Sequence, residues 1–244
     1  EGGFDGVDIQ SVIASADGSH FVIGGNYSGG GQIDGFLLPA SEYARGILFR
    51  MTKSGKVEWL VEMGRLATIR KVVELSNGQY AIAGNCRVPT SVQMTVKTDK
   101  GTLSSEVIGE LKPNRESVFV GFTDSISVNH WFRIAAGVTT SFRDLATTPH
   151  GEVVLSFGHS GSATFDRVGG HRHLPGIGNG IARFDGVGML LDQLQTKFSD
   201  RFSMQLLTTD DSGKLQLGSY AHRRSRILGS TENAVENILF WAAE

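Results

Sequence analysis

A short phrase that recurs four times constrains the fold of this 244-residue sequence more than any other feature. It combines a turn signal, an apolar run and a glycine, as in "DGSHFVIGGN", which begins at Asp17. The glycines that follow the four apolar runs are 60, 74 and 60 residues apart when aligned: Gly24, Gly84, Gly158 and Gly218. Such a period predicts a repeat protein in which each unit is one supersecondary structure.

Each unit is predicted to consist of β-strands joined by tight turns. Asp17-Gly18 and Asn77-Gly78 lie between strand-like runs, and such dipeptides favour two-residue type I′ hairpins. Ser54-Gly55 and Lys100-Gly101 mark a second hairpin further along. The sequence has 32 glycines but only five prolines, which favours many tight turns over a disordered chain. Four strands per unit at a period near 60 residues predict the blades of a β-propeller.

The predicted architecture is therefore a single all-β domain, a small β-propeller with four four-stranded antiparallel blades. The last unit lacks a fourth strand, so we expect the segment 1–8 to pair with Ile238–Trp241 and close the ring. Segment 110–137 is predicted to be an insertion that holds half of a degenerate fifth blade, which keeps five blades as the alternative. The repeat units span residues 9–64, 69–109, 142–198 and 202–244.

The first unit resembles known bacterial repeats. Its "DGSHFVIGGN" and "GILFRMTKSGKVEWLVEMG" are similar to β-propeller repeats of the Asp-Gly-Gly-Tyr-hydrophobic-Ala-Gly type. Gly55-Lys56-Val57-Glu58-Trp59 matches the Gly-Lys-x-x-Trp of PQQ-like propeller repeats. The second unit matches nearly as well, and the third and fourth match more loosely. The resemblance implies a propeller fold and a secreted or surface-exposed bacterial protein, without implying one activity or a cofactor.

Composition narrows the classes of partner. The net charge of −2 creates no field that would favour nucleic acid, and no apolar run is long enough for a transmembrane helix. We therefore predict neither nucleic-acid binding nor membrane insertion. Cys86 is the only cysteine, and it is expected to be a buried strand residue. Because the chain begins at Glu1 without Met, we expect it to be a processed product.

The long connections predict a binding face. In a four-stranded blade the short turns lie at one end, and the long segments 26–45, 159–178, 219–233 and 110–137 all fall at the other. Long loops on a rigid scaffold usually carry recognition. The residues expected to bind a ligand there are Asn26, Tyr27, Asp34, Trp131, His159, His171, Arg172, His173, Tyr220, His222 and Arg223.

Three functions fit this organisation. The first is a non-enzymatic recognition or scaffold module that binds a protein, glycan or small ligand. The second is a metal-assisted, lactonase-like hydrolase, because alternating histidines place two imidazoles on one side of an extended segment. Its candidate ligands are His159, Asp166, His171 and His173, to which no metal is assigned. The third is a purely structural domain of a larger bacterial surface protein.

Overall fold

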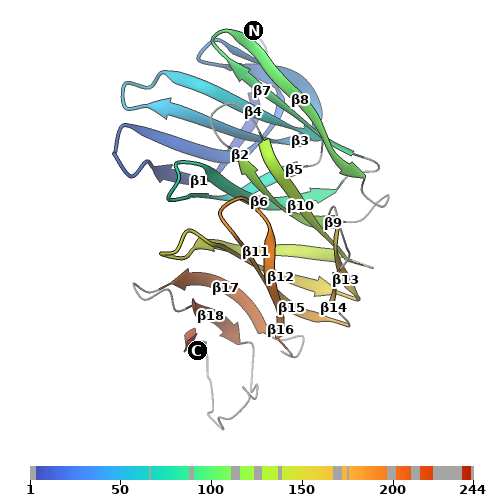
Figure 1. The fold of residues 1–244 in the computed structure, drawn as a ribbon. Helices are drawn as coiled ribbons and strands as arrows, with labels where there is room; N and C mark the ends of the chain where they lie inside the picture. The colour runs from blue at the N-terminus through green and yellow to red at the C-terminus, as the bar shows by residue number, and fades with distance from the viewer. Residues whose placement is uncertain are drawn as a thin grey trace.

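The fold is built from β-strands that form four antiparallel sheets (Figure 1). The computed structural model describes residues 4–65, 67–87, 91–110, 116–123, 128–136, 139–166, 172–174, 176–196, 202–209, 215–221 and 238–242. Every regular element within these ranges is a strand, which confirms the all-β prediction. The sheets follow one another from the N-terminal to the C-terminal end of the molecule (Figure 1).

The first two sheets have six strands each. Sheet A has the order β1-β2-β3-β4-β7-β8 and sheet B the order β14-β13-β10-β9-β6-β5. The strands of sheet A are β1 (Phe4–Ala14), β2 (His20–Ile33), β3 (Phe36–Thr52), β4 (Val57–Arg65), β7 (Ser91–Thr98) and β8 (Gly101–Glu110). Those of sheet B are β5 (Ala67–Glu74), β6 (Tyr80–Arg87), β9 (Glu116–Thr123), β10 (Val128–Ala136), β13 (Ala163–Asp166) and β14 (Arg172–Leu174).

The other two sheets are smaller. Sheet C has the order β11-β12-β15-β16 and sheet D the order β17-β18-β19. Their strands are β11 (Thr139–Thr147), β12 (Val153–Ser160), β15 (Gly178–Phe184), β16 (Leu190–Thr196), β17 (Phe202–Thr209), β18 (Leu215–Ala221) and β19 (Ile238–Ala242). The first unit therefore contributes four consecutive strands to one sheet. The third contributes four strands to sheet C, but its β13 and β14 join sheet B.

The second unit is divided between two sheets, which differs from the predicted blade. Its second hairpin, β7–β8, pairs with β4 of the first unit through Val61↔Val96. Strand β6 pairs instead with β9 through Ala83↔Val120. Segment 110–137, predicted to be an insertion, thus supplies the regular strands β9 and β10 of sheet B.

The side chains of β9 explain this exchange. Val118, Val120 and Phe122 are buried toward sheet C, while Phe119 packs toward sheet A. A strand that is apolar on both faces suits a position between two sheets. In β7, by contrast, only Val96 is buried among the side chains from Thr95 to Thr98 that the structure describes. Strand β9 therefore takes the central place that the repeat pattern had assigned to β7.

The short turns also differ from the predicted type I′ turns. At Asn77-Gly78, the amide of Gly78 donates to the carbonyl of Leu75 (2.9 Å) and the amide of Leu75 donates to that of Gln79 (2.8 Å). Gly78 has a φ of 77°, whereas Asn77 has no positive φ. This is a three-residue loop, Ser76 to Gly78, whose glycine alone adopts the left-handed conformation. A type I′ turn does occur at Asp34-Gly35, where both φ values are positive (44° and 87°).

A β-bulge marks the beginning of all four units. One extra residue interrupts the pairing in β1, β5, β11 and β17; these residues are Gln10, Arg70, Arg143 and Gln205. The bulges correct the sequence alignment, because Ile9 pairs with Gly25 and Ile69 with Gly84. Gly25 is therefore the structural match of Gly84, and the turn of the first unit, from Ser15 to His20, is one residue longer.

The bulge explains why the repeated phrase contains glycine at this position. A Cβ atom on Gly84 would lie 1.9 Å from the carbonyl oxygen of Thr68, and one on Gly25 would lie 2.2 Å from that of Asp8. Because the obstacle is backbone, no side-chain rotation can relieve the clash. In the third unit the matching residue is Phe157, which pairs with Phe142.

The N-terminal segment does not form the predicted pair with the C-terminal strand. Phe4–Asp8 continues β1 and pairs with β2, with Phe4 opposite Gly29 and Asp8 opposite Asn26. Strand β19 pairs with β18 at the other end of the molecule (Figure 1). The strand order of the described residues therefore contains no ring closed by this route.

The core lies between the sheets. Val22, Leu48 and Val61 of sheet A pack with Ile69 and Val72 of sheet B. A second cluster joins sheets B and C, and its largest side chains are Phe122, Phe157 and Phe184. Trp59 and Cys86 are buried in the first cluster, which confirms the predicted burial of Cys86. The repeat thus produces layers that bury one sheet against the next.

The bulge predicts a large effect of a small substitution. We expect Gly84→Ala to lower the free energy of unfolding by about 2–3 kcal/mol, because the bulged backbone must move to admit the methyl group. The matched control is Gly6→Ala on β1, where a Cβ atom would meet nothing within 4 Å. Urea denaturation measures both, and equal stabilities of the two variants would contradict the role of the bulge.

Candidate functional site

The segment predicted to be the first long loop is a β-hairpin that folds back over sheet A. We call residues 28–44, from β2 and β3, the arm. Its Phe36 and Leu38 are buried with Leu60 in an apolar cluster on this face. At its tip, the carboxylate of Asp34 accepts a hydrogen bond from the amide of Val57 (2.6 Å). Val57 begins β4 at the short turns, so Asp34 lies at the end opposite to the predicted one.

A buried carboxylate lies on the same face of sheet A. Glu62 of β4 is 5% exposed and accepts hydrogen bonds from the Tyr27 hydroxyl (2.9 Å) and the Lys97 ammonium (2.9 Å). Arg45 of β3 also donates to it. Lys97 donates in addition to the carbonyl of Leu37 in the arm (2.8 Å). Glu62 thus connects β2, β3, β4 and β7. Lys97 connects this group to the arm.

The electrostatics of this cluster follow from burial and from the Glu62 charge. Burial, and then the negative charge of Glu62, raise the pKa of Tyr27 well above its ordinary value of about 10. Burial alone would lower the pKa of Arg45, but its hydrogen bond with Tyr27 and the charge of Glu62 outweigh this and raise it. At neutral pH Tyr27 therefore stays a neutral donor and Arg45 stays a cation. Both keep their hydrogen bonds to Glu62, so the cluster holds its strands together.

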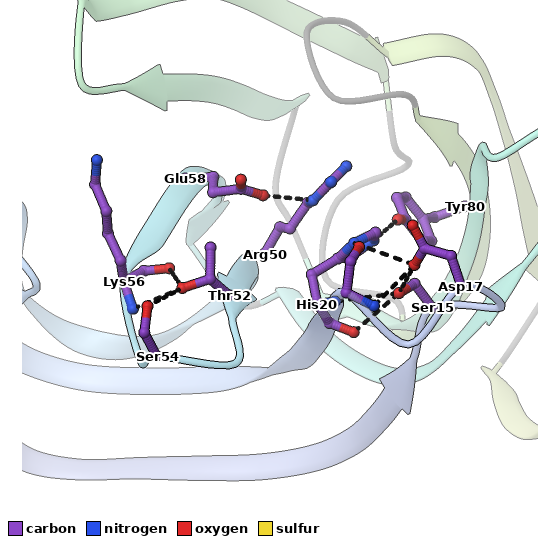
Figure 2. Close-up of polar contacts among 10 residues, drawn as sticks. Ser15, Asp17, His20, Arg50, Thr52, Ser54, Lys56, Glu58 and Tyr80 are labelled. Atoms are coloured by element: carbon purple, nitrogen blue, oxygen red, sulfur yellow. Dashed lines mark hydrogen bonds and ion pairs between the residues drawn. The ribbon is translucent and has the colours of Figure 1, made fainter.

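A second polar cluster lies at the first short turn and crosses from sheet A to sheet B (Figure 2). His20 is 7% exposed, and its Nε2 is 2.8 Å from the hydroxyl of Tyr80 on β6. Its Nδ1 is 2.7 Å from the hydroxyl of Ser19. Because both ring nitrogens have a partner, His20 acts as a link between sheets.

The turn around His20 is fixed by its own side chains. The Ser15 hydroxyl donates to the carboxylate of Asp17 (2.6 Å), which also accepts from the amide of Ser19 (2.9 Å). These hydrogen bonds hold the pKa of Asp17 well below its usual range, so Asp17 is ionised at neutral pH. Burial raises the pKa of Tyr80, which therefore stays protonated.

Polar side chains also join sheet B to sheet C. The side-chain oxygen Oδ1 of Asn85 accepts a hydrogen bond from the backbone amide of Phe142 (3.1 Å), next to the third bulge. The Asn85 amide group donates to Glu116 (2.5 Å). Lys71 forms an ion pair with the buried Asp144 (3.1 Å). Charged and amide groups thus stabilise the layers as well as apolar ones.

The predicted ligand-binding residues are distributed over several elements. Asn26 is half-buried and Tyr27 is fully buried, both on β2. His159 lies one residue before the end of β12 and is 5% exposed, and its Nδ1 is 2.8 Å from the carbonyl oxygen of Gly161. The structure places the others as follows: Trp131 on β10 opposite Gly121, Arg172 and His173 on β14 opposite Phe165 and Thr164, and Tyr220 on β18 opposite Ser203. His171, His222 and Arg223 lie outside the described residues.

The second long segment is also more regular than predicted. Most of its described residues form β13 and β14, a hairpin that extends sheet B by pairing with β10. Of the proposed metal ligands, Asp166 pairs with Arg133 and His173 with Thr164. Across the part of the chain that the structure describes, no three His, Cys, Asp or Glu side chains are placed to hold a metal ion.

Sequence analysis missed the Glu62 cluster. The signal was present in "VEWLVEMG", where Glu62 lies between the apolar run Trp59–Val61 and Met63. A carboxylate in such a position needs donors from neighbouring strands. Lys97 could not be matched to it, because β4 pairs with β7 only when the second unit is divided between sheets.

Comparisons with known proteins add no assignment: no protein-family model and no curated protein matches the sequence. Within the described residues, no helix is long and apolar enough to cross a membrane.

The Glu62 cluster predicts how stability depends on pH. We expect Tyr27→Phe to lower the free energy of unfolding at pH 7 by about 1.5–3 kcal/mol, as for a hydrogen bond to a charged group. The folded protein keeps Tyr27 protonated, so the unfolded state binds fewer protons above pH 10 and the wild type loses stability there.

The Tyr27→Phe variant should lose less stability than the wild type as the pH rises above about 10. Urea denaturation at several pH values measures both slopes. Tyr80→Phe is the control for the second buried phenol, whose raised pKa contributes in the same direction. Parallel curves for the wild type and Tyr27→Phe would contradict the shifted pKa.

Proposed function

We propose that this chain is a non-enzymatic recognition or scaffold module that binds a protein, glycan or small ligand at the end of its sheets opposite the short turns. The proposal rests on a difference between the two ends of the sheets: polar groups at the short turns are paired with each other, whereas a buried polar atom at the other end is not, within the residues that the structure describes. At the short turns, Asn77 and Gln79 bond each other, and Asp185 accepts from the amides of Val187 and Met189. These groups are already paired and offer little to a ligand.

The opposite end supports binding better. His159 lies there, and its Nε2 is buried without a hydrogen-bond partner among the residues that the structure describes. An unpaired buried polar atom is costly, and a ligand group that bonds to it would recover this cost. The β13–β14 hairpin follows His159 directly and carries Arg172 and His173 at this end.

The scaffold is best described, in our proposal, as a β-propeller-type arrangement. The first strands of the four units, β1, β5, β11 and β17, contact one another in this order. Each begins with the same bulged hairpin, as blades around an axis would. Such a scaffold holds its connections rigidly, which suits a recognition module. We propose that the module belongs to a secreted or surface-exposed protein.

A binding screen tests the proposed face. Purified protein is screened against glycans, candidate proteins and divalent metals, and any ligand found is titrated with Arg172→Ala/His173→Ala. We expect at least about a tenfold loss of affinity and an unchanged unfolding midpoint. The matched control is Lys53→Ala/Asn77→Ala at the exposed short turns, which should bind normally.

Two outcomes would overturn the proposal. One is loss of binding in the Lys53→Ala/Asn77→Ala control with normal binding in Arg172→Ala/His173→Ala. The other is stoichiometric zinc, nickel or calcium in the purified protein together with metal-dependent ester or lactone hydrolysis, which would establish the hydrolase instead.

A further inference from the structure

The outer face of β1 carries an apolar stripe at the first layer of the molecule. Val7, Ile9 and Val12 are 39%, 54% and 56% exposed, respectively. The bulge at Gln10 places all three on one face, because it shifts the alternation by one residue. Three large apolar side chains exposed in a row on an edge strand are unusual for a surface that faces only water.

The repeat shows what this stripe corresponds to in the other units. Counted from the bulge, Val7, Ile9 and Val12 match Ala67, Ile69 and Val72 of β5, all of which are 0% exposed. They match Thr140, Phe142 and Leu145 of β11, of which Thr140 and Leu145 are 1% exposed and Phe142 packs against the core. These positions bury the second and third units against the sheet that precedes them.

The residues that cover these positions are equivalent at the junction between sheets A and B and at the junction between sheets B and C. Sheet A covers β5 with Ser11 and Ile13 of its own bulged hairpin, and the Ser11 hydroxyl accepts a hydrogen bond from the amide of Val72 (3.1 Å). Sheet B covers β11 with the matching residues Lys71 and Val73. We call the face of a bulged hairpin toward the previous sheet its preceding face, and the face toward the next sheet its following face. Each junction therefore packs the following face of one bulged hairpin against the preceding face of the next.

The arm covers only part of the preceding face of sheet A. Its Phe36 and Leu38 pack with Ile47 of β3 and Leu60 of β4, whereas β1 is left open. The stripe is thus the part of a layer junction that lacks its neighbouring layer.

The last unit repeats the register of the layer junctions. Its bulge places Leu206 at the register position of Lys71 and Asp144, which belongs to the following face in the other units. The pairing of β17 and β18 with β19 aligns Phe240 with Gly218 and Leu206. Sheets A and D lie at opposite ends of the molecule, so the chain does not bring these two faces together (Figure 1).

We propose that a second copy of this chain docks on β1, with the following face of its sheet D against Val7, Ile9 and Val12. The contact continues the layer junction that the chain already builds between sheets A and B and between sheets B and C. It joins unlike surfaces of two copies, so the association is head to tail and can extend to further copies. Docking depends on the repeat register and not on the ligand face near His159, so either proposal can fail alone.

Sedimentation velocity over a range of concentrations tests the association. We expect the wild type to form species larger than one chain, and Ile9→Lys/Val12→Lys to raise the concentration for half-association at least about tenfold. The matched control is Val187→Lys/Met189→Lys, which adds two charges at exposed apolar positions in the turn between β15 and β16 and should associate like the wild type. Circular dichroism and the unfolding midpoint establish that each variant is folded.

Cross-linking tests the orientation. Ile9→Cys and Phe240→Cys are placed in separate chains, mixed and treated with a short bismaleimide; Cys86, 2% exposed, is the only other thiol. We expect a cross-linked dimer from the mixture and much less from either variant alone. A wild type that stays a single chain at every concentration would overturn the proposal. So would an Ile9→Cys/Phe240→Cys chain that cross-links within itself when dilute.

Discussion

The bulge in the first strand of each unit determines how the layers of this protein form. The carbonyl oxygens of Asp8 and Thr68 occupy the space that a side chain at Gly25 or Gly84 would need. The extra residue in the bulge shifts the alternation of side chains, so Ile69 and Val72 both face sheet A while Val73 faces sheet C. One strand can therefore serve two junctions, and a chain of such hairpins becomes a series of buried layers.

Polar groups complete the junctions that the apolar core begins. His20 and Tyr80 connect sheets A and B, and Asn85 connects sheets B and C through the amide of Phe142. Within sheet A, Glu62 holds the arm and four strands through three donors. A buried carboxylate with this many donors is costly to disturb, because removing one partner leaves charge without compensation. Glu62, which contacts the predicted site residue Tyr27, and His20 are thus part of the scaffold.

The sequence predicted the strands and the positive φ of Gly78, because these depend on neighbours along the chain. It did not predict that β7 leaves the second unit for β4, since local patterns do not choose between two partners that both suit a half-buried strand. The arm was missed because glycine-rich 28–31 suggested a loop, although Asp34-Gly35 forms the type I′ hairpin turn that such a dipeptide favours. The one-residue difference between the first two turns hid the true match of Gly25 to Gly84.

The bulge can be observed directly by nuclear magnetic resonance. Backbone NOEs around Gly84 report which residues of β5 lie opposite it. Our account predicts contacts that pair Ile69 with Gly84 and Lys71 with Ala83, with Arg70 left out of the ladder, and the same pattern for Ile9, Gln10 and Gly25. Regular pairing, with Arg70 taking its own cross-strand partner, would contradict the register on which the layered fold and its docking face both depend.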